Sequence, residues 1–305
     1  MKLAYAALQG VTGLADQTLV LAEGGSPPPD LFVIGGGTGS GKTRLLEAIM
    51  AAKETAGPYL GMVRSEDWCD GEHTARVELH FTLNDEERAL AASAPSPARV
   101  VAAWGRAGTR VECDRAVSHL LSRYEHEPTL SKFEYVPENR QRAWGARCDG
   151  LGAFEQSLHR MSKDPQKYSF LPRFLSSLRT DVSKRRAFAE ALETLSMTVR
   201  FQLPEDPEDD TLFVSRGGEG AFLSELSSSE VDAVILAASA VNLSLNHSIV
   251  FFDRPELYLH PDHVKRFVQS LVKLGRDNQW IVATSSPAVI ESVQRNQLHM
   301  LGGRQ

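Results

Sequence analysis

The clearest chemistry in this sequence lies in a glycine-rich run that ends in a lysine and a threonine. The pattern G-x-x-x-x-G-K-[ST] is met by Gly36-Gly37-Thr38-Gly39-Ser40-Gly41-Lys42-Thr43. Glycines let successive backbone N–H groups converge on anionic oxygens, the lysine reaches the β- and γ-phosphates, and the hydroxyl that follows ligates Mg²⁺. The run therefore predicts a nucleoside triphosphate site in which Lys42 contacts phosphate and Thr43 holds Mg²⁺.

The residues on either side of this run must position it. An apolar stretch, Leu31 to Ile34, precedes the glycines, and helix-favouring residues follow from Arg44 to Ile49. A helix that starts here presents the positive end of its dipole to the same phosphates. This strand and helix context favours a phosphate-binding loop over an incidental glycine turn. The predicted nucleotide contacts in this loop are Gly36, Gly37, Thr38, Gly39, Ser40, Gly41, Lys42, Thr43 and Arg44.

Two later segments also contain residues that could take part in ligand binding. Ser227 and Glu230 have capping-box spacing ahead of an apolar helix that we expect to run to Leu245. A capped helix start of this kind is a second anion site, which the phosphate loop of the same chain does not need. The apolar run from Ser248 ends in the acid Asp253, a pattern typical of a strand buried on both faces of a parallel sheet.

Composition limits the class of protein. The chain has 305 residues, 42% of them hydrophobic, and a net charge of −6, so it can bury a core and is not a generally electropositive nucleic-acid binder. Three cysteines without C-x-x-C spacing indicate neither a disulfide framework nor a zinc site. With no signal or membrane-spanning pattern, we expect a cytoplasmic protein without a membrane partner. A basic cluster at residues 184–186 is either a contact for an acidic partner or DNA, or simply a solvated helix face.

The order of elements predicts an α/β fold with a mainly parallel sheet. A ribbon of two strands at the N-terminus should lie beside the nucleotide-binding strand, and a helical insert should occupy residues 145–205 of a single domain, 1–305. His80, on the polar face of an alternating strand, is expected to face solvent rather than bind metal. The other expected strands and helices are Ala75–Leu83, Arg99–Trp104, Thr109–Cys113, Phe133–Pro137, Asp181–Met197, Pro261–Leu274 and Trp280–Thr284.

Taken in order, these motifs resemble the ABC-type ATPase heads of the group formed by RecF, the chromosome-maintenance (SMC) proteins and the overcoming-lysogenisation-defect (OLD) proteins. The resemblance includes the Tyr135–Arg140 segment after a strand. Leu226 to Glu230 resembles the signature L-S-S-G-E, and Asp253 to Pro261 resembles D-E-P-E-x-x-L-H-P. Thr284 to Pro287 resembles T-H-S-P. The match is to a stand-alone ATPase of this group.

The resemblance implies a P-loop NTPase that binds ATP and Mg²⁺ and forms a head-to-tail homodimer or higher homo-oligomer. The signature residues Ser227, Ser228 and Ser229 of one subunit would contact the ATP held by the other. Asp253 would support Mg²⁺ through water. Gln141 would sense the γ-phosphate, with Gln156 and Gln166 as alternatives. Residues 255–260 would pack at the dimer interface, although His260 could equally be the cap of the helix that begins at Pro261.

Three departures from the group's pattern bear on hydrolysis. Arg254 replaces the glutamate that positions water, Ser285 replaces the switch histidine, and Ser229 replaces the signature glycine. Arginine stays protonated and cannot orient water as a carboxylate does. We therefore expect nucleotide binding with weak or absent hydrolysis. Two alternatives remain open, because Glu256 could supply the missing carboxylate and Arg254 could stabilise transition-state charge.

The functional hypothesis is a nucleotide-gated dimer that recruits or controls a separate effector, a nuclease or toxin, in bacterial anti-phage defence. It rests on resemblance, and on the expectation that no C-terminal nuclease domain follows the last strand. The alternative is an active ATPase that cycles on DNA in repair or recombination. A small-molecule kinase would share the phosphate loop but would leave the motifs at Leu226 and Asp253 unexplained.

Overall fold

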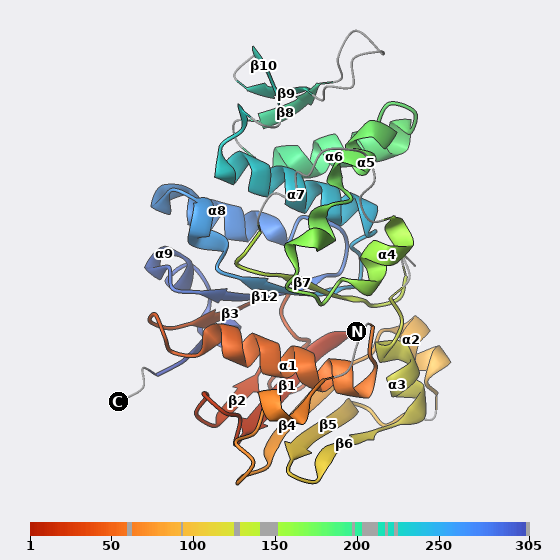
Figure 1. Cartoon of the computed structure of the whole chain (residues 1–305), viewed down its shortest axis with the longest axis vertical. Helices are drawn as coiled ribbons and strands as arrows, with labels where there is room; N and C mark the ends of the chain where they lie inside the picture. Colours follow the sequence, from red (N-terminus) through yellow and green to blue (C-terminus); the bar gives the residue numbers. More distant parts are fainter. Residues whose placement is uncertain are drawn as a thin grey trace.

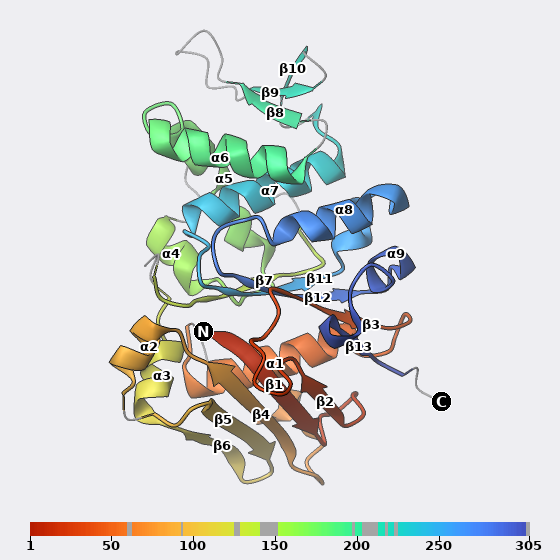
Figure 2. The ribbon, with the colours of Figure 1, turned by 180° about the vertical axis from the view of Figure 1, so that it is seen from behind.

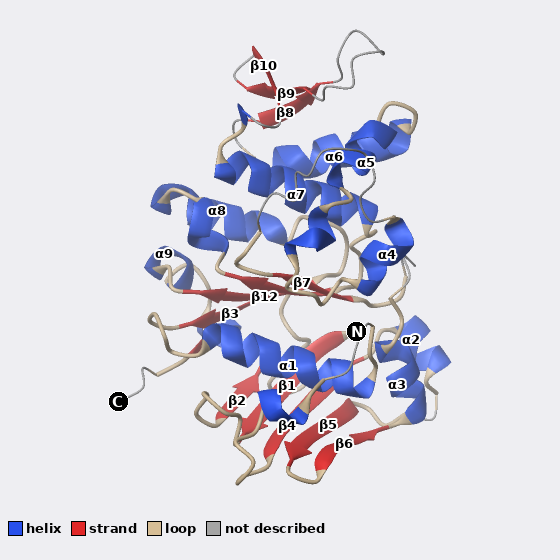
Figure 3. Cartoon of the chain, viewed as in Figure 1, coloured by secondary structure: helices blue, strands red, loops and turns tan. Residues whose placement is uncertain are grey.

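Two five-stranded sheets with one long helix between them form the centre of the fold (Figure 1). The computed structural model describes residues 1–59, 63–92, 94–124, 129–140, 152–196, 199–202, 213–216, 219–222 and 225–302. Coloured by secondary structure, these residues stack as an antiparallel sheet, a helix, a parallel sheet and a layer of further helices (Figure 3). The phosphate loop lies where the parallel sheet meets the helix between the two sheets.

The central sheet is parallel throughout and has the strand order β13-β3-β12-β11-β7. Its strands are β3 (Leu31–Gly35), β7 (Phe133–Val136), β11 (Ile249–Asp253), β12 (Gln279–Thr284) and β13 (Leu298–Met300). Every residue of β3, β7, β11 and β12 is buried. Phe32 and Ile34 pack toward the antiparallel sheet, whereas Leu31 and Val33 pack into the helical layer. The continuous apolar runs are thus explained by burial on both faces, as predicted.

The N-terminal ribbon does not lie beside the nucleotide-binding strand, so that expectation was wrong. Strand β1 (Lys2–Gln9) pairs with β2 (Gln17–Val20) and β4 (Ala75–Thr82) in a separate antiparallel sheet, which continues through β5 (Ala98–Gly105) and β6 (Gly108–Cys113). The physical reason is the alternating pattern of these strands, best seen in β4, which suits a sheet with one polar face. It does not suit the doubly buried surroundings of β3.

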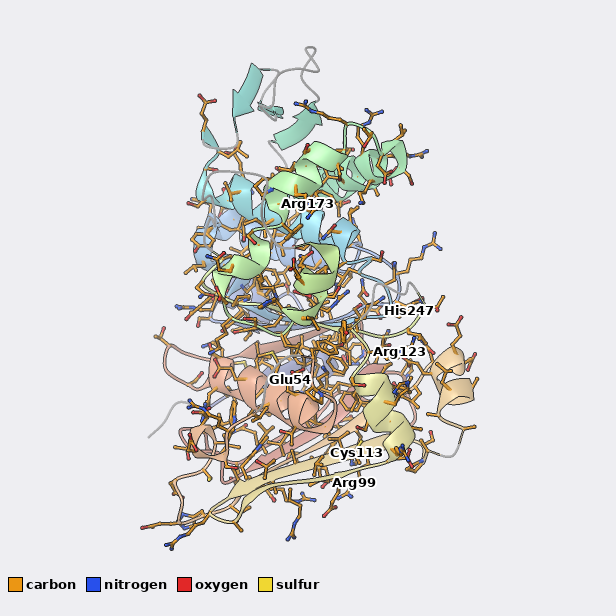
Figure 4. The ribbon with its side chains drawn as sticks, turned by 45° about the vertical axis from the view of Figure 1, so that its right-hand side comes forward. Glu54, Arg99, Cys113, Arg123, Arg173 and His247 are labelled. Atoms are coloured by element: carbon orange, nitrogen blue, oxygen red, sulfur yellow. The ribbon has the colours of Figure 1, made fainter. Side chains whose placement is uncertain are left out.

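The polar face of this antiparallel sheet carries ion pairs instead of a metal site. His80 lies there within 2.9 Å of Glu78, and the guanidinium of Arg99 lies 2.6 Å from the same carboxylate. Figure 4 shows Arg99 and Cys113 on the adjacent strands β5 and β6 of this sheet. Within the described ranges, no group of three or more His, Cys, Asp and Glu side chains could hold a metal ion. His80 is therefore hydrogen-bonded to a carboxylate that also pairs with Arg76 and Arg99.

Helix α1 (Lys42–Ala56) fills the space between the two sheets (Figure 2). It is buried around most of its circumference, since its apolar residues belong to the same core cluster as the inner faces of both sheets. Such all-round burial fixes the helix axis and therefore the start of the helix at Lys42. The phosphate loop is consequently held between a rigid strand, β3, and a rigid helix.

Helices cover the far face of the parallel sheet, and the small sheet β10-β9-β8 lies beyond them. The capping box predicted at Ser227 with Glu230 is confirmed, and Asn84 with Glu87 forms another at the start of α2. None of the helices within the described ranges combines the length and apolar character required to traverse a bilayer. The remaining elements are η1 (Ser65–Asp67), α2 (Asp85–Leu90), α3 (Arg115–Leu121), α4 (Ala153–Leu158), η2 (Pro165–Tyr168), α5 (Leu171–Ser177), α6 (Val182–Leu195), β8 (Val199–Gln202), β9 (Phe213–Arg216), β10 (Glu219–Phe222), α7 (Ser228–Asn242), η4 (Pro255–Tyr258), α8 (Pro261–Leu271), α9 (Pro287–Ile290) and η5 (Arg295–Gln297).

Candidate nucleotide-binding site

The loop between β3 and α1 requires glycine for its conformation. Gly39 and Gly41 have φ values of 79° and 96°, in the left-handed region that disfavours residues with a side chain. A Cβ atom on Gly41 would also come within 2.8 Å of Leu14 Cδ1. Gly41 is the N-cap of α1 and has no side chain that could cap the helix. The first N–H groups of α1 are thereby left for an anion, as the sequence pattern predicts.

Lys42 lies across this loop. Its Nζ donates hydrogen bonds of 2.8 Å to the carbonyl oxygens of Gly36 and Gly37, and the residue is only 7% exposed. Burial lowers the pKa of Lys42, Glu256 opposes that shift, and the positive charge of Arg254 adds to it. The ammonium group thus sits where phosphate oxygens would meet it, close to a second cation.

Asp253 ends β11 as a buried carboxylate without a well-formed hydrogen bond. The residue is 0% exposed, and neither carboxylate oxygen has a partner with good hydrogen-bond geometry among the described residues, although the Thr43 hydroxyl lies close by. Burial raises the pKa of Asp253; the Thr43 hydroxyl opposes that shift, and the nearby charge of Glu138 adds to it. An unpaired buried carboxylate is costly unless a cation satisfies it. The pair Thr43 and Asp253 therefore fits Mg²⁺, which binds through few protein ligands together with water and phosphate.

At the position where the resemblance leads us to expect a water-orienting carboxylate, the chain has Arg254, and the structure shows what this arginine contacts. Its backbone is left-handed, with φ 51° and ψ 64°. Its guanidinium lies 2.8 Å from the carboxylate of Glu138, which follows β7. Glu138 belongs to the Tyr135–Arg140 segment, but the sequence alone predicts no role for it. The signal that could have found it is its place after a strand of the same parallel sheet, where the carboxyl ends of the strands share one edge.

Glu256 is held by the end of β12. The Thr284 hydroxyl donates to one of its carboxylate oxygens and the Ser285 backbone N–H to the other, each at 2.8 Å. A carboxylate with both oxygens engaged joins η4 to the end of β12, and this geometry favours a structural role. Its catalytic role stays a prediction, as does the effect of serine at 285.

Arg140 is a second residue to which sequence analysis gave no role. Its guanidinium is buried and donates to the Asp232 carboxylate at 2.6 Å, to the carbonyl of Pro137 at 2.8 Å and to the carbonyl of Asp253 at 3.0 Å. A further bond of 3.3 Å reaches the carbonyl of Arg254. One side chain thereby joins the loop after β7, the end of β11 and helix α7.

The signature segment forms the start of α7. The N–H of Ser227 donates to Glu230 Oε2 at 2.8 Å, and Glu230 N–H donates to Ser227 Oγ at 3.4 Å. Ser227 and Ser228 are exposed, and Ser229 is half-buried. A cavity of about 490 Å³ between the ends of α6, α7 and α8 borders Ser227 and Ser229. His260 at its rim accepts a 3.4 Å hydrogen bond from Asp262 N–H, so its alternative role as the cap of α8 is confirmed.

Several predicted contacts lie elsewhere or cannot be placed. Gln141 lies outside the described residues. Of its two alternatives, Gln156 is buried in α4 and bonded to Asn242, and Gln166 is exposed in η2. The Arg44 guanidinium lies 4.2 Å from the centre of the Trp68 ring and donates to Thr12, at the turn after β1. Its contact with phosphate stays a prediction.

Comparison with known proteins places this geometry in a known architecture. No model of a known protein family matches the chain. Protein ea59 of Escherichia phage lambda is 26% identical in an alignment of 151 residues that covers 43% of this chain and 29% of that protein. The chain thus spans less than a third of the length of this relative.

Solved structures of SMC head domains share the whole fold. An SMC head bound to the C-terminal winged-helix domain of ScpA matches with a TM-score of 0.62 and 16% identity, covering 98% of this chain and 96% of that one. The Thermotoga maritima SMC head matches at 0.54 and 17%, covering 98% and 94%. The Pyrococcus furiosus Smc head, bound to the C-terminal domain of ScpA, matches at 0.58 and 14%, covering 95% and 91%. The chain therefore has the fold of an ABC-type ATPase head, and the expected fold class is confirmed.

Proposed function

We propose that this protein binds ATP with Mg²⁺ and signals through the bound state rather than through consumption of the nucleotide. The observation that carries the proposal is the contrast at one sheet edge. Asp253 is buried, unpaired and faces Thr43. The next residue, Arg254, occupies the position where a carboxylate would orient water and is already paired with Glu138.

The residues of the chain support binding directly. The backbone of residues 36–43 and the start of α1 bind and orient phosphate, Lys42 neutralises its charge, and Thr43 with Asp253 holds the cation. Mg²⁺ supplies charge neutralisation at the phosphates when bound. Arg254 cannot accept a proton, and Ser285 lacks the charge of a histidine. Each loss lowers the rate of hydrolysis by on the order of 10² or more.

The proposal includes a nucleotide-gated homodimer. The exposed start of α7 turns the N–H groups of Ser228 and Ser229 toward an anion, and the phosphate loop of the same subunit does not need them. The Ser227 hydroxyl donates to Glu230 Oε2 at 2.7 Å and would exchange that partner for the anion. A second copy arranged head to tail would bring its Ser227 to Ser229 onto the bound triphosphate. ATP then closes the dimer, and the closed dimer presents a surface that neither monomer has.

We propose that a separate effector protein binds that surface. Two of the SMC head structures hold a domain of another protein, ScpA, and a head of the same fold offers similar scope for a protein partner. By the resemblance to stand-alone ATPases, we propose a nuclease or toxin as effector and anti-phage defence as the setting. Plaque assays in bacteria that carry the chain with its native neighbouring genes test this part, and Lys42→Ala should abolish protection.

The decisive experiment measures three quantities on the purified protein, namely equilibrium binding of ATP with Mg²⁺, molar mass by light scattering, and phosphate release with and without DNA. We expect binding, an ATP-dependent dimer and release far slower than about 1 s⁻¹, the lower end of ordinary turnover. Lys42→Ala is the control that should neither bind nor dimerise. Failure to retain ATP would overturn the proposal. Turnover faster than that limit, stimulated by DNA, would instead support the alternative of an ATPase that cycles on DNA.

A further inference from the structure

One ion pair at the edge of the phosphate site has its charges in an unexpected arrangement. Arg254 stands at the position of a carboxylate, and a carboxylate, Glu138, stands opposite it on the loop after β7. Arg254 Nη1 and Glu138 Oε2 are 2.8 Å apart, and the two side chains are 39% and 46% exposed. An ion pair this exposed contributes little to stability, since water screens both charges. Its location beside the phosphate loop points to a different use.

The backbones that carry this pair are fixed, whereas the side chains are accessible. Arg254 N–H donates to the carbonyl of Ala283 at 2.9 Å, and the Arg254 carbonyl accepts from the buried Arg140. The same guanidinium binds the carbonyl of Pro137, which immediately precedes Glu138. Arg140 therefore holds both attachment points in place. Only the half-exposed ends of Arg254 and Glu138 are left to change partners.

The neighbouring charges would change when a triphosphate binds. The charge of Arg254 already acts on Lys42, which places the two cations close together. Glu138 lies near enough to Asp253 to disfavour its ionised form. A terminal phosphate between Lys42 and Thr43 would offer Arg254 an anion with more charge than a carboxylate and a geometry that guanidinium binds well. The same phosphate would repel Glu138.

We propose that Arg254 exchanges Glu138 for the terminal phosphate, so that this ion pair makes the site selective for nucleoside triphosphate over diphosphate. The inference rests on the proposed function and deepens it, because a gate that responds to occupancy must distinguish ATP from ADP. The exchange also gives Arg254 a contact with the terminal phosphate, which the Ser285 side chain is too short to make. In this scheme Glu138 is the competitor that must be displaced.

Opposite effects of two neutralising variants test the exchange. Affinities for ADP and for the non-hydrolysable adenosine 5′-(β,γ-imido)triphosphate are measured by calorimetry with Mg²⁺. Arg254→Gln should weaken triphosphate binding about tenfold, the loss expected for a charge-assisted hydrogen bond. Glu138→Gln should tighten triphosphate binding about threefold, since a half-exposed competitor is removed. Affinity for ADP should change by less than about twofold in both variants.

A matched exposed pair supplies the control. Arg186 and Glu190 on α6 are 2.9 Å apart, and neutralising either one should leave both affinities unchanged. In the double variant Arg254→Gln with Glu138→Gln, the gain from removing Glu138 should disappear. A gain of equal size in that background would show simple repulsion and overturn the exchange. So would losses of the same sign for both single variants, or equal effects on ADP. If the unmodified protein binds neither nucleotide, the proposed function itself fails, which is a separate outcome.

Discussion

Two neighbouring regions of the sheet edge are built on different principles. At the phosphate-gripping region, Lys42 is 7% exposed and Asp253 is 0% exposed, and Asp253 makes no well-formed hydrogen bond to a described residue. At the water-positioning region, Arg254 and Glu138 are about half as exposed as free side chains and neutralise each other. The gripping region contains a buried ammonium and a buried carboxylate, whose charges phosphate and a cation would neutralise. In the other region the two charges already form an ion pair, and the proposed function, nucleotide binding without efficient hydrolysis, rests on this difference.

The largest expected effect concerns the side chain that ties the two regions together. Arg140→Met should lower the free energy of unfolding by about 3–5 kcal/mol, because it leaves the buried carboxylate of Asp232 without its partner. Urea denaturation of the unliganded protein measures this loss. Adding Asp232→Leu to the same protein should recover much of it, since both buried charges are then gone. A loss below about 1 kcal/mol would mean that Arg140 does not hold the two regions together.

The next effect isolates the gripping region. Lys42→Ala should weaken ATP binding about 100-fold or more, because it removes the cation that meets the terminal phosphates. The melting temperature should change little, since the hydrogen bonds that Lys42 makes to described residues go to carbonyls of its own loop. Calorimetric titration with Mg²⁺ and ATP, beside a thermal melt, separates these outcomes. Unchanged affinity would remove the gripping region as the phosphate site.

Asp253→Asn should have opposite effects on stability and on metal-dependent binding. Neutralising this buried carboxylate should raise the free energy of unfolding at pH 7 by about 1–3 kcal/mol and weaken ATP binding in Mg²⁺ about tenfold. The two measurements are denaturant unfolding and ATP titration with and without Mg²⁺. Destabilisation by Asp253→Asn would show that the carboxylate is satisfied within the protein and is not a cation site.

The difference in stability between Asp253→Asn and the unmodified protein should depend on pH, and the sign of this dependence can be worked out. Burial raises the pKa of Asp253 in the folded protein. The folded state therefore binds the proton more tightly than the unfolded state, and the contribution to stability falls as pH rises from about 4 through the raised pKa. The stability advantage of Asp253→Asn over the unmodified protein should be small at pH 4 and grow to a plateau. A constant difference across this range would contradict the assignment.

The smallest expected effect concerns the water-positioning region. Arg254→Glu combined with Glu138→Gln should raise the rate of phosphate release about tenfold, because a carboxylate is restored where water would be oriented. Arg254→Glu alone should gain less, since the new carboxylate would face Glu138 at ion-pair distance. A steady-state phosphate assay compares the three proteins. An inert double variant would place the catalytic defect elsewhere, with Ser285 and Ser229 as the remaining departures.

Much of the local structure could be predicted from the sequence, because it depends on residues close together in the chain. The capping boxes at Asn84 and Ser227 are set by a partner three residues on. The alternation in β4 indicates a strand buried on one face, and the unbroken apolar run in β11 indicates a strand buried on both. The glycines of the phosphate loop report a backbone that only glycine adopts without strain.

What only the tertiary structure decided is which distant residues meet. Arg140 and Asp232 are 92 residues apart, and Glu138 and Arg254 are 116 apart. Glu138 and Arg254 meet because β7 is paired with β11, which brings the loops after both strands to one edge of the sheet. Asp232 reaches Arg140 from helix α7. Strand order depends on how all the layers pack, and no local pattern encodes it. The same reason explains why the N-terminal ribbon was misplaced, while the strand, loop and helix start around Lys42 and Thr43 were predicted from the sequence alone.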